Sequence, residues 1–443
     1  LSKKETGAVI TGQQPHIYGS PLYTIYKILT AIITAKNLSR KNQRSYVPVF
    51  WNASDDHDFS EINHAAFPDA LQGVMRFHLD FPYTGEPIYA YQTGQEFSRL
   101  NVGFISGLKQ TEFTTLVNEY ISLPVNSPAE QMTNIIKRLF AGTGLVIVEP
   151  RLLRNHCKEI YREIALNDRA INAEVNETGS KTGNFIIRDH SSNLFYLGNN
   201  KREKIWFNNS SVNFQGKAIT QQEFADYVFH HPEQFSPNAA VRPVVQDVLF
   251  PTVCYIGGPG ECNYFSQLKP VYEILGVRMP VIKPRVSATI LTPREIRIME
   301  KYSLNAHDVL NNRTSISDHD ETEKDTQYAD DFIEKVRAEI ERFCIHAEKI
   351  NREIKDGLNS SVRKMEFELE KMKEKYIKGC EKSRGVFRGH ITRLMETILP
   401  GNLLQERVFT PLYYINLYGN SFIEKLQSGF NTEKNEHHVI YLD

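Results

Sequence analysis

The segment TGQQPHIYGSPLYTIYK, from Thr11 to Lys27, decides the fold of this chain. A short apolar run precedes it, as expected of a buried strand, and Gly12 and Gly19 bracket a polar loop. Ser20 and Pro21 suit the N-cap and first position of a helix, because a proline there loses no intrahelical hydrogen bond. The spacing therefore predicts a strand, a loop and a helix in succession.

The same loop is a candidate anion site. Unpaired N–H groups and the helix dipole at a helix start attract negative charge. The side chains of Gln13, Gln14 and His16 can complete such a site, and Tyr23 follows one turn into the helix. An ordinary strand-to-helix turn that binds nothing explains these residues equally well, so both interpretations stay open.

A second apolar run, from Tyr46 to Trp51, predicts the next strand. A strand, a helix and a strand within about fifty residues favour a parallel βαβ unit and an open α/β sheet. Ligands in such sheets bind beyond the carboxyl ends of the strands. We therefore expect the loop after Thr11 and the segment after Trp51 to lie at one cleft.

The segment after Trp51 reads SDDHDFSEINH and contains Asp56, His57 and Asp58. By spacing, His57, Glu61 and His64 share one face of a helix, where they can bind a metal or do acid-base work. The competing interpretation is a solvated helix start whose carboxylates are stabilised by the helix dipole. We favour that interpretation over a metal site.

A third segment, from Arg242 to Gly276, combines the strand Val253–Ile256 with the turn GGPGE and an amphipathic helix. Three glycines within four residues let the backbone approach a ligand closely, although a tight structural turn is the alternative. The glycines are Gly257, Gly258 and Gly260.

Three polar side chains follow or flank this glycine turn. Glu261 and Tyr264 lie in the first turns of the predicted helix and can recognise an amine or a hydroxyl. Arg285, in the next predicted strand, is available to a phosphate or is a surface charge.

From residue 318 the chain becomes charged and helical. Apolar residues recur in steps of four and three from Val336 to Ile354 and again from Val362 to Tyr376, which predicts two coiled-coil seams with a break near Gly357, Asn359 and Ser360. Two antiparallel helices can cover each other. The length and charge of the segment favour docking against a second subunit, and hence a homodimer.

The predicted organisation is a core interrupted by two insertions and followed by a helical domain. The ranges are 1–66, 126–172 and 242–317 for the core, 67–125 and 173–241 for the insertions, 318–400 for the coiled coil, and 401–443 for a segment returning to the core.

Composition limits the class of protein. The 443 residues include 52 Lys and Arg and 53 Asp and Glu. The net charge is therefore close to zero and does not favour binding to nucleic acid or to an anionic membrane. Five cysteines without CxxC spacing favour reduced thiols and a cytoplasmic location. No apolar run reaches the ~18 residues of a membrane span, and no signal-peptide pattern is visible. We expect no nucleic-acid partner and no membrane partner.

Three stretches in matching order resemble the BshC family, the cysteine ligases of bacillithiol biosynthesis: GQQ with PLYTIYK, PVFWNASDDHDFSEINH, and PTVCYIGGPGE. Ser20 stands where relatives usually have glycine, and His16 where many have a smaller residue. The resemblance implies an α/β fold: a Rossmann-like parallel sheet core with two inserted connecting-peptide segments, as in class I aminoacyl-tRNA-synthetase-like enzymes, and a C-terminal α-helical coiled-coil domain that dimerises.

The resemblance also implies the reaction. Cysteine is joined to the amino group of glucosaminyl-malate in the last step of bacillithiol biosynthesis, and the fold suggests activation by ATP as a cysteinyl adenylate, with Mg²⁺ as a further candidate. No GxxxxGK[ST] motif is present. The alternatives are a nucleotidyltransferase-like enzyme for another small acid and a dimeric metabolite-binding scaffold.

The candidate residues follow from these stretches. The catalytic candidates are His16, Asp56, His57 and Asp58. The candidate substrate- or nucleotide-binding residues are Gly12, Gln13, Gln14, Ser20, Tyr23, Gly257, Gly258, Gly260, Glu261, Tyr264 and Arg285. No residue is assigned as a metal ligand.

Overall fold

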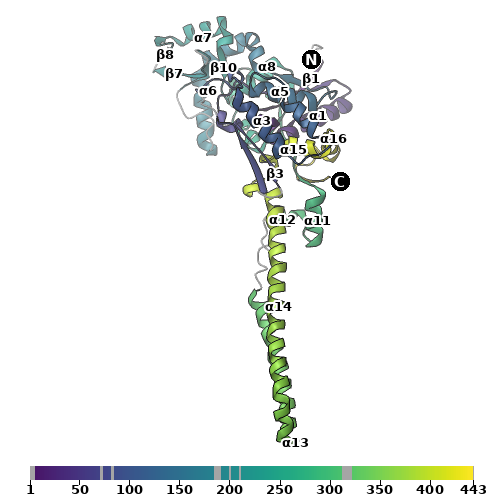
Figure 1. Ribbon diagram of the computed structural model, residues 1–443. Coiled ribbons are helices and arrows are strands. Elements are labelled where there is room, and N and C mark those ends of the chain that lie inside the picture. Colours follow the sequence, from purple (N-terminus) through teal and green to yellow (C-terminus); the bar gives the residue numbers. More distant parts are fainter. Residues whose placement is uncertain are drawn as a thin grey trace. The chain divides into compact units, whose positions relative to one another are not determined.

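A computed structural model describes residues 5–69, 73–80, 84–183, 191–198, 201–208, 211–311 and 322–442. The chain forms two compact units (Figure 1). The first comprises Leu1–Ile290 and Asn402–Leu442, and the second comprises Leu291–Gly401.

A five-stranded parallel sheet forms the centre of the first unit, in the order β12-β11-β1-β2-β5. The strands are β1 (Gly7–Gln13), β2 (Tyr46–Asn52), β5 (Val146–Val148), β11 (Thr252–Gly257) and β12 (Val281–Pro284). The predicted parallel βαβ unit is confirmed, because β1 pairs with β2 from Gly7 to Gln13 without a break.

Helices cover both faces of this sheet, because successive strand residues point to opposite sides. Val9 packs on one side against α1 (Tyr23–Asn42), and Ile10 packs on the other in the cluster that includes α6 (Lys158–Thr182) and α8 (Arg242–Leu249). Every residue of β1 is buried. The loop after β1 is therefore anchored on a rigid core strand.

The start of α1 differs from the sequence expectation. The helix begins at Tyr23 after Leu22, and a 3₁₀ turn spans Ile17–Gly19. Ser20 precedes a cis peptide bond to Pro21, and no side chain caps the helix. The prediction of Ser20 as N-cap is wrong, because the chain uses two more residues to reach the helix.

The chain between β2 and β5 adds a hairpin and helices. They are α2 (Phe59–Ile62), β3 (His64–Asp69), β4 (Gly73–His78), α3 (Gln95–Gly107), α4 (Thr114–Ile121) and α5 (Pro128–Leu139). Ser127 Oγ accepts from the N–H of Glu130 at 3.3 Å, as expected for the start of α5.

A second, antiparallel sheet follows α6, in the order β10-β6-β7-β8-β9. Its elements are β6 (Ser191–Tyr196), β7 (Glu203–Asn208), β8 (Ser211–Phe214), β9 (Lys217–Ile219), α7 (Gln221–His230) and β10 (Phe235–Pro237). The spacing of Thr220 and Glu223 in the sequence predicts a capping box, and this capping box is present at the start of α7. The expected strand residues 185–190 lie outside the described residues.

The expected long helix after the glycine turn is two short ones, α9 (Pro259–Phe265) and α10 (Lys269–Ile274), ending at Gly276 with φ +64°. The C-terminal segment rejoins the first unit. Its elements are α15 (Pro411–Tyr418), α16 (Ser421–Gly429) and β14 (His437–Tyr441), which pairs with β13 (Ser287–Leu291).

The second unit is helical. It contains α11 (Pro293–Lys301), α12 (Ala306–Leu310), α13 (Thr322–Ile350) and α14 (Arg352–Ile398). Ion pairs such as Arg337 with Glu370 show that α13 and α14 form an antiparallel hairpin. The predicted break near Gly357 is wrong, because the chain turns at Asn351, and α14 runs through Gly357, Asn359 and Ser360.

Short 3₁₀ turns complete the elements: Ile17–Gly19, Ile88–Ala90, Pro150–Leu152, Arg154–Cys157, Pro232–Gln234, Pro400–Asn402 and Gln405–Arg407. Within the described part of the chain, none of the helices has the length and apolar character needed to span a membrane.

Candidate active site

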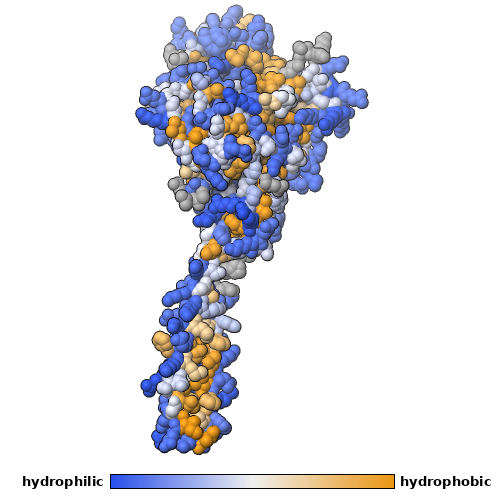
Figure 2. Space-filling model, turned by 45° about the vertical axis from the view of Figure 1, so that its right-hand side comes forward, coloured by the Kyte–Doolittle hydropathy of each residue, from blue (hydrophilic) through white to orange (hydrophobic). Residues whose placement is uncertain are grey.

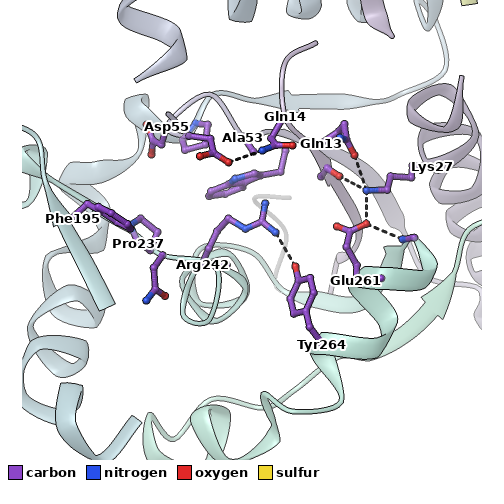
Figure 3. Close-up of a pocket in the computed structure, with 18 of the residues that line it drawn as sticks. Gln13, Gln14, Lys27, Ala53, Asp55, Phe195, Pro237, Arg242, Glu261 and Tyr264 are labelled. Atoms are coloured by element: carbon purple, nitrogen blue, oxygen red, sulfur yellow. Dashed lines mark hydrogen bonds and ion pairs between the residues drawn. The ribbon is translucent and has the colours of Figure 1, made fainter. Parts of the chain in front are cut away.

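A cavity of about 700 Å³ lies in the first unit beside the carboxyl ends of β1, β2 and β11 (Figure 3). Gly12 and Gln13 line it at the end of β1, Trp51 at the end of β2, and Gly258 after β11. Open α/β sheets bind their ligands at this edge. The loop after Thr11 and the segment after Trp51, which were expected to lie at one cleft, both line this cavity, and the glycine turn after β11 lines it as well.

Positive charge predominates among the side chains that line the cavity. Of the described residues in the lining, six are cationic, namely Lys27, Arg202, Lys204, Arg242, Arg285 and Arg407, and three are acidic, namely Asp55, Asp56 and Glu261. Guanidinium and ammonium groups bind carboxylates and phosphates with charge-assisted hydrogen bonds. The cavity is therefore suited to an anionic ligand.

Lys27 joins the two loops. Its ammonium group donates to the Gly12 carbonyl and to Gln13 Oε1, both at 2.9 Å, and forms an ion pair with Glu261. Burial lowers the pKa of Lys27, and the Glu261 charge partly offsets this effect. Lys27 lies four residues after Tyr23 on α1, so the two side chains share a helix face.

Both carboxylate oxygens of Glu261 accept hydrogen bonds from groups of the protein. Its Oε1 accepts from the Tyr255 hydroxyl and its Oε2 from the Gly258 N–H, each at 2.8 Å, in addition to the pair with Lys27. Burial alone would raise the pKa of Glu261, but the Lys27 charge outweighs it and lowers the pKa. Because both oxygens have donors, we assign Glu261 to holding the loop.

Gly258 leaves open space beside charged groups. Its φ is −73°, so the backbone conformation does not require glycine. A Cβ atom there would lie 3.4 Å from Glu261 Oε2, 3.8 Å from Lys27 Cε and 3.9 Å from Arg285 Nε. The missing side chain therefore keeps a polar part of the cavity accessible.

Arg242 carries a positive charge without an acidic partner. It begins α8, and its Nη2 donates to the hydroxyl of Tyr264 on α9 at 3.1 Å. Figure 3 shows its guanidinium group between the loops, directed toward Tyr264. No carboxylate among the described residues forms an ion pair with it. A guanidinium group of this kind can bind a carboxylate or a phosphate.

Gln14 connects the first loop to the acidic segment after β2. Its Nε2 donates to Asp56 Oδ2 at 2.8 Å and to Glu61 Oε2 at 2.5 Å. Burial alone would raise the pKa of Asp56, but the interaction with the His57 side chain and the Arg202 charge outweigh it and hold the pKa well below its usual range. Asp56 is therefore an ionised acceptor.

The acidic residues do not form a magnesium site. Asp55 pairs with Arg154, and Asp56 lies 3.5 Å from Arg202. Mg²⁺ prefers carboxylates that are free to bind it. Across the described residues, no three His, Cys, Asp or Glu side chains are grouped so that they can hold a metal ion. This donor set does not fit the cation.

The expected helical trio is not formed. α2 covers only Phe59–Ile62, so His57 precedes the helix and His64 already begins β3. The prediction that His57, Glu61 and His64 share a helix face is wrong, because the hairpin starts sooner than the spacing suggested.

Several candidate residues do not line the cavity. His16 is buried, with Nδ1 3.1 Å from the Gln14 carbonyl oxygen, and burial lowers its pKa to about 4. Asp58 is exposed and accepts from Ser60 Oγ at 2.6 Å. Ser20, His57 and Gly257 are also absent from the lining.

Arg285 is buried and not a surface charge. Its Nη2 lies 2.6 Å from Glu406 Oε1, and its guanidinium group lies 5.3 Å from the centre of the Tyr23 ring. Glu406 also accepts from the N–H of Ala288 at 2.9 Å. The C-terminal segment thus holds one of the cations that line the cavity.

Sequence reasoning missed five cationic residues of the cavity lining, namely Lys27, Arg202, Lys204, Arg242 and Arg407. The four-residue spacing from Tyr23 could have identified Lys27. Arg202 comes from the second insertion and meets its partner 145 residues away, so no local pattern marks it.

Comparison with known proteins covers almost the whole chain. Residues 1–286 match the family described as "Bacillithiol biosynthesis BshC, N-terminal Rossmann-like domain", and residues 288–442 match "Bacillithiol biosynthesis BshC, C-terminal coiled-coil domain". These descriptions agree with the parallel sheet of the first unit and the helical hairpin of the second.

Curated relatives carry the name "Putative cysteine ligase BshC". The protein of Carboxydothermus hydrogenoformans is 27% identical over 100% of this chain and 86% of its own length. Those of Salinibacter ruber and Staphylococcus aureus are 26% and 28% identical, over 99% and 93% of this chain and 84% and 80% of their own lengths.

A solved structure named "putative arginyl t-RNA synthetase", from Campylobacter jejuni, aligns over 98% of this chain and 94% of its own with 10% identity and a TM-score of 0.27. That score is too low to support an argument. The two family models together account for residues 1–286 and 288–442, and the chain belongs to the BshC family of bacillithiol biosynthesis.

Proposed function

We propose that this protein is the ligase that joins cysteine to the amino group of glucosaminyl-malate and so completes bacillithiol. Family membership and the naming of the curated relatives support ligase activity. The observation that carries the proposal is the cavity, where six cationic side chains face three acidic ones at the ligand-binding edge of the sheet.

Amide formation requires an activated carboxyl group. In the proposed reaction, a carboxylate oxygen of cysteine attacks the α-phosphorus of ATP, and pyrophosphate leaves. The amine of glucosaminyl-malate then attacks the acyl carbon, loses a proton, and displaces AMP. Both steps build negative charge on oxygen, which fixed positive groups stabilise.

The cationic side chains of the cavity differ in whether an acidic residue of the protein pairs with them. Lys27 pairs with Glu261 and Arg285 pairs with Glu406, so these two shape the cavity. Among the described residues, the Arg242 side chain has only the Tyr264 hydroxyl as a partner. We assign Arg242 to the phosphate or carboxylate groups of the substrates. Asp55 and Asp56 already pair with arginines, so no Mg²⁺ ligand is assigned to the protein.

We also propose that the protein forms a homodimer through the second unit. Phe343 on α13 and Met365 on α14 are 61% and 50% exposed in one chain. They border an apolar groove of about 440 Å³ on the hairpin, and Figure 2 shows hydrophobic side chains gathered there. Burying such a face against a second copy removes apolar area from water. The five free cysteines support a cytoplasmic location.

The test is a reconstituted reaction of purified protein with cysteine, ATP and glucosaminyl-malate. We expect bacillithiol by mass spectrometry, with one AMP and one pyrophosphate per product. Formation of ADP and phosphate would contradict the adenylate. Turnover with a different small acid would favour a nucleotidyltransferase-like enzyme, and no turnover with any acid would favour a binding scaffold.

A matched pair of variants locates the reaction. Arg242→Met removes the guanidinium group from the cavity, and we expect a rate loss of about 10²-fold or more. Arg278→Met removes an exposed arginine outside the cavity lining and should leave the rate unchanged. Equal rates in both variants would show that the cavity is not the active site.

A further inference from the structure

The contact between Arg202 and His57 determines which nitrogen of the imidazole carries the proton. Arg202 Nη1 lies 2.9 Å from His57 Nδ1. A guanidinium group has N–H donors and no acceptor, so Nδ1 must accept. A neutral imidazole has one donor and one acceptor nitrogen, and the proton of His57 therefore resides on Nε2.

Asp56 is the second group near Nδ1 of His57, and it is the more distant one. Its Oδ1 lies 3.5 Å from His57 Nδ1, farther than the guanidinium nitrogen. That oxygen instead accepts from the backbone N–H of His57 at 2.7 Å. A proton on Nδ1 would also place two donors face to face, since Arg202 cannot accept.

Arg202 is held firmly where it meets the imidazole. Its Nε donates to Ser236 Oγ at 3.0 Å, and its Nη2 donates to the Pro237 carbonyl at 2.9 Å. The guanidinium group also lies 3.9 Å from the centre of the Phe195 ring. These contacts come from the second sheet, so the insertion sets the orientation of a side chain that follows the core strand β2.

The Nε2 side of His57 is available to a ligand. None of the described residues forms a hydrogen bond with Nε2, and the side chain is 37% exposed. Its neighbours Asp56, Phe195 and Arg202 all line the cavity. His57 is itself outside the lining but contacts three residues that belong to it, and its Nε2 has no partner among the described residues.

We propose that Arg202 is a positioning residue that holds His57 in the Nε2–H tautomer, and that His57 donates a hydrogen bond from Nε2 to an acceptor oxygen of a bound carboxylate or phosphate. His57 then does not act as a general base. The second half of this inference rests on the proposed function, and the first half does not.

The tautomer is tested without any substrate. Protein labelled with ¹⁵N in its histidines is studied by long-range ¹H–¹⁵N NMR, and the His57→Gln variant assigns the signals of His57. We expect a deshielded, unprotonated Nδ1 and a protonated Nε2. A protonated Nδ1, alone or together with Nε2, would overturn the proposal.

Two variants, one of Arg202 and one of Ser236, distinguish control of the His57 tautomer from a packing role of the Arg202 side chain. Arg202→Met removes the donor to Nδ1, and we expect the His57 signals to move toward a mixture of tautomers. Ser236→Ala removes only the partner of Nε and should leave these signals in place. An unchanged tautomer in a folded Arg202→Met protein would contradict the role given to Arg202.

Two variants of His57 test its use as a donor. Gln places an amide N–H close to the position of Nε2, whereas the amide of Asn reaches only the position of Nδ1, and neither can act as a base. We expect His57→Gln to retain product formation within about tenfold of the native rate and His57→Asn to lose about 10²-fold or more. Equal losses of 10²- to 10⁴-fold in both folded variants would indicate a general base and overturn the proposal.

Failure of the proposed reaction is recognised separately. If the native protein makes no bacillithiol from cysteine, ATP and glucosaminyl-malate, the proposed function fails, while the NMR spectra still decide whether Arg202 sets the tautomer. If the native protein is active and Nδ1 is protonated, this inference alone fails.

Discussion

Two cationic residues of the cavity differ in what balances their charge. Lys27 is buried and has Glu261 as a partner, whereas the Arg242 side chain contacts only the Tyr264 hydroxyl within the part of the chain that the structure describes. A paired buried charge mainly holds structure, and a cation without an acidic partner is available to a ligand. Loss of Lys27 should therefore appear first in stability, and loss of Arg242 first in the reaction.

Replacing Lys27 by Met should destabilise the first unit by about 3–5 kcal/mol, because the charge of Glu261 is left buried without its partner. The double variant with Glu261→Gln should recover part of this loss. Urea unfolding followed by tryptophan fluorescence measures the effect, since Trp51 and Trp206 both lie in the first unit. Additive effects of the two changes would contradict the coupling.

His16 should make the first unit sensitive to acid. Its folded pKa of about 4 lies below the ordinary value of 6.5, so the unfolded chain binds the proton first as the pH falls. The contribution of His16 to stability is fully present above pH 6.5 and is lost as the pH falls from 6.5 to 4. The loss amounts to roughly 3.5 kcal/mol at most, at about 1.4 kcal/mol per pKa unit.

His16→Asn is the control for this pH dependence. Asn keeps a donor for the Gln14 carbonyl but does not titrate. Urea midpoints at several pH values should therefore fall less steeply below pH 6.5 in the variant than in the native protein. Parallel curves would show that His16 is not the group responsible.

At the scale of elements, α14 passes through a glycine that the sequence pattern placed at a break. Gly357 is exposed within the helix, and nothing lies within 4 Å of an added Cβ atom. Glycine inside a helix costs about 1 kcal/mol relative to alanine. Replacing Gly357 by alanine should therefore stabilise the continuous helix.

Gly357→Ala should raise the thermal midpoint of helix unfolding measured by circular dichroism. Gly276→Ala should have the opposite effect on stability. Gly276 follows α10 with φ +64°, and alanine is strained in that conformation. We expect Gly276→Ala to lower stability by about 1 kcal/mol. A lower midpoint for Gly357→Ala would support a break in the helix and contradict its continuity.

At the scale of the whole molecule, the exposed apolar face of the α13–α14 hairpin bears on assembly. Replacing Phe343 and Met365 together by Lys places charge on the groove that we assign to the dimer. We expect a monomer with unchanged helix content, because both side chains are exposed in the single chain. Light scattering coupled to size exclusion measures the mass.

The control for assembly is Glu381→Lys, which changes charge at an exposed position of α14 outside the groove. This variant should remain dimeric. A native protein that is already monomeric at micromolar concentration would contradict the proposed homodimer.

Local patterns in the sequence determined much of the fold. Apolar runs, glycine turns and capping residues act over a few neighbours, so they predicted β1, β2, the glycine loop after β11, and α7 with its capping box. The order of the motifs also indicated the family. The exact start of α1 and the turn at Asn351 were not predictable, because helix ends depend on contacts beyond the local window.

The chemistry of the site was decided only by the tertiary structure. Gln14 with Asp56 came from two recognised motifs, so their meeting was predictable from the sheet edge. The partners of Lys27, Arg285 and His57 lie 234, 121 and 145 residues away in the chain, and charge pairing at such separations leaves no periodic signal. The sequence therefore determined which loops meet. Only the tertiary structure determined which of their charged side chains form ion pairs within the protein and which remain available to a ligand.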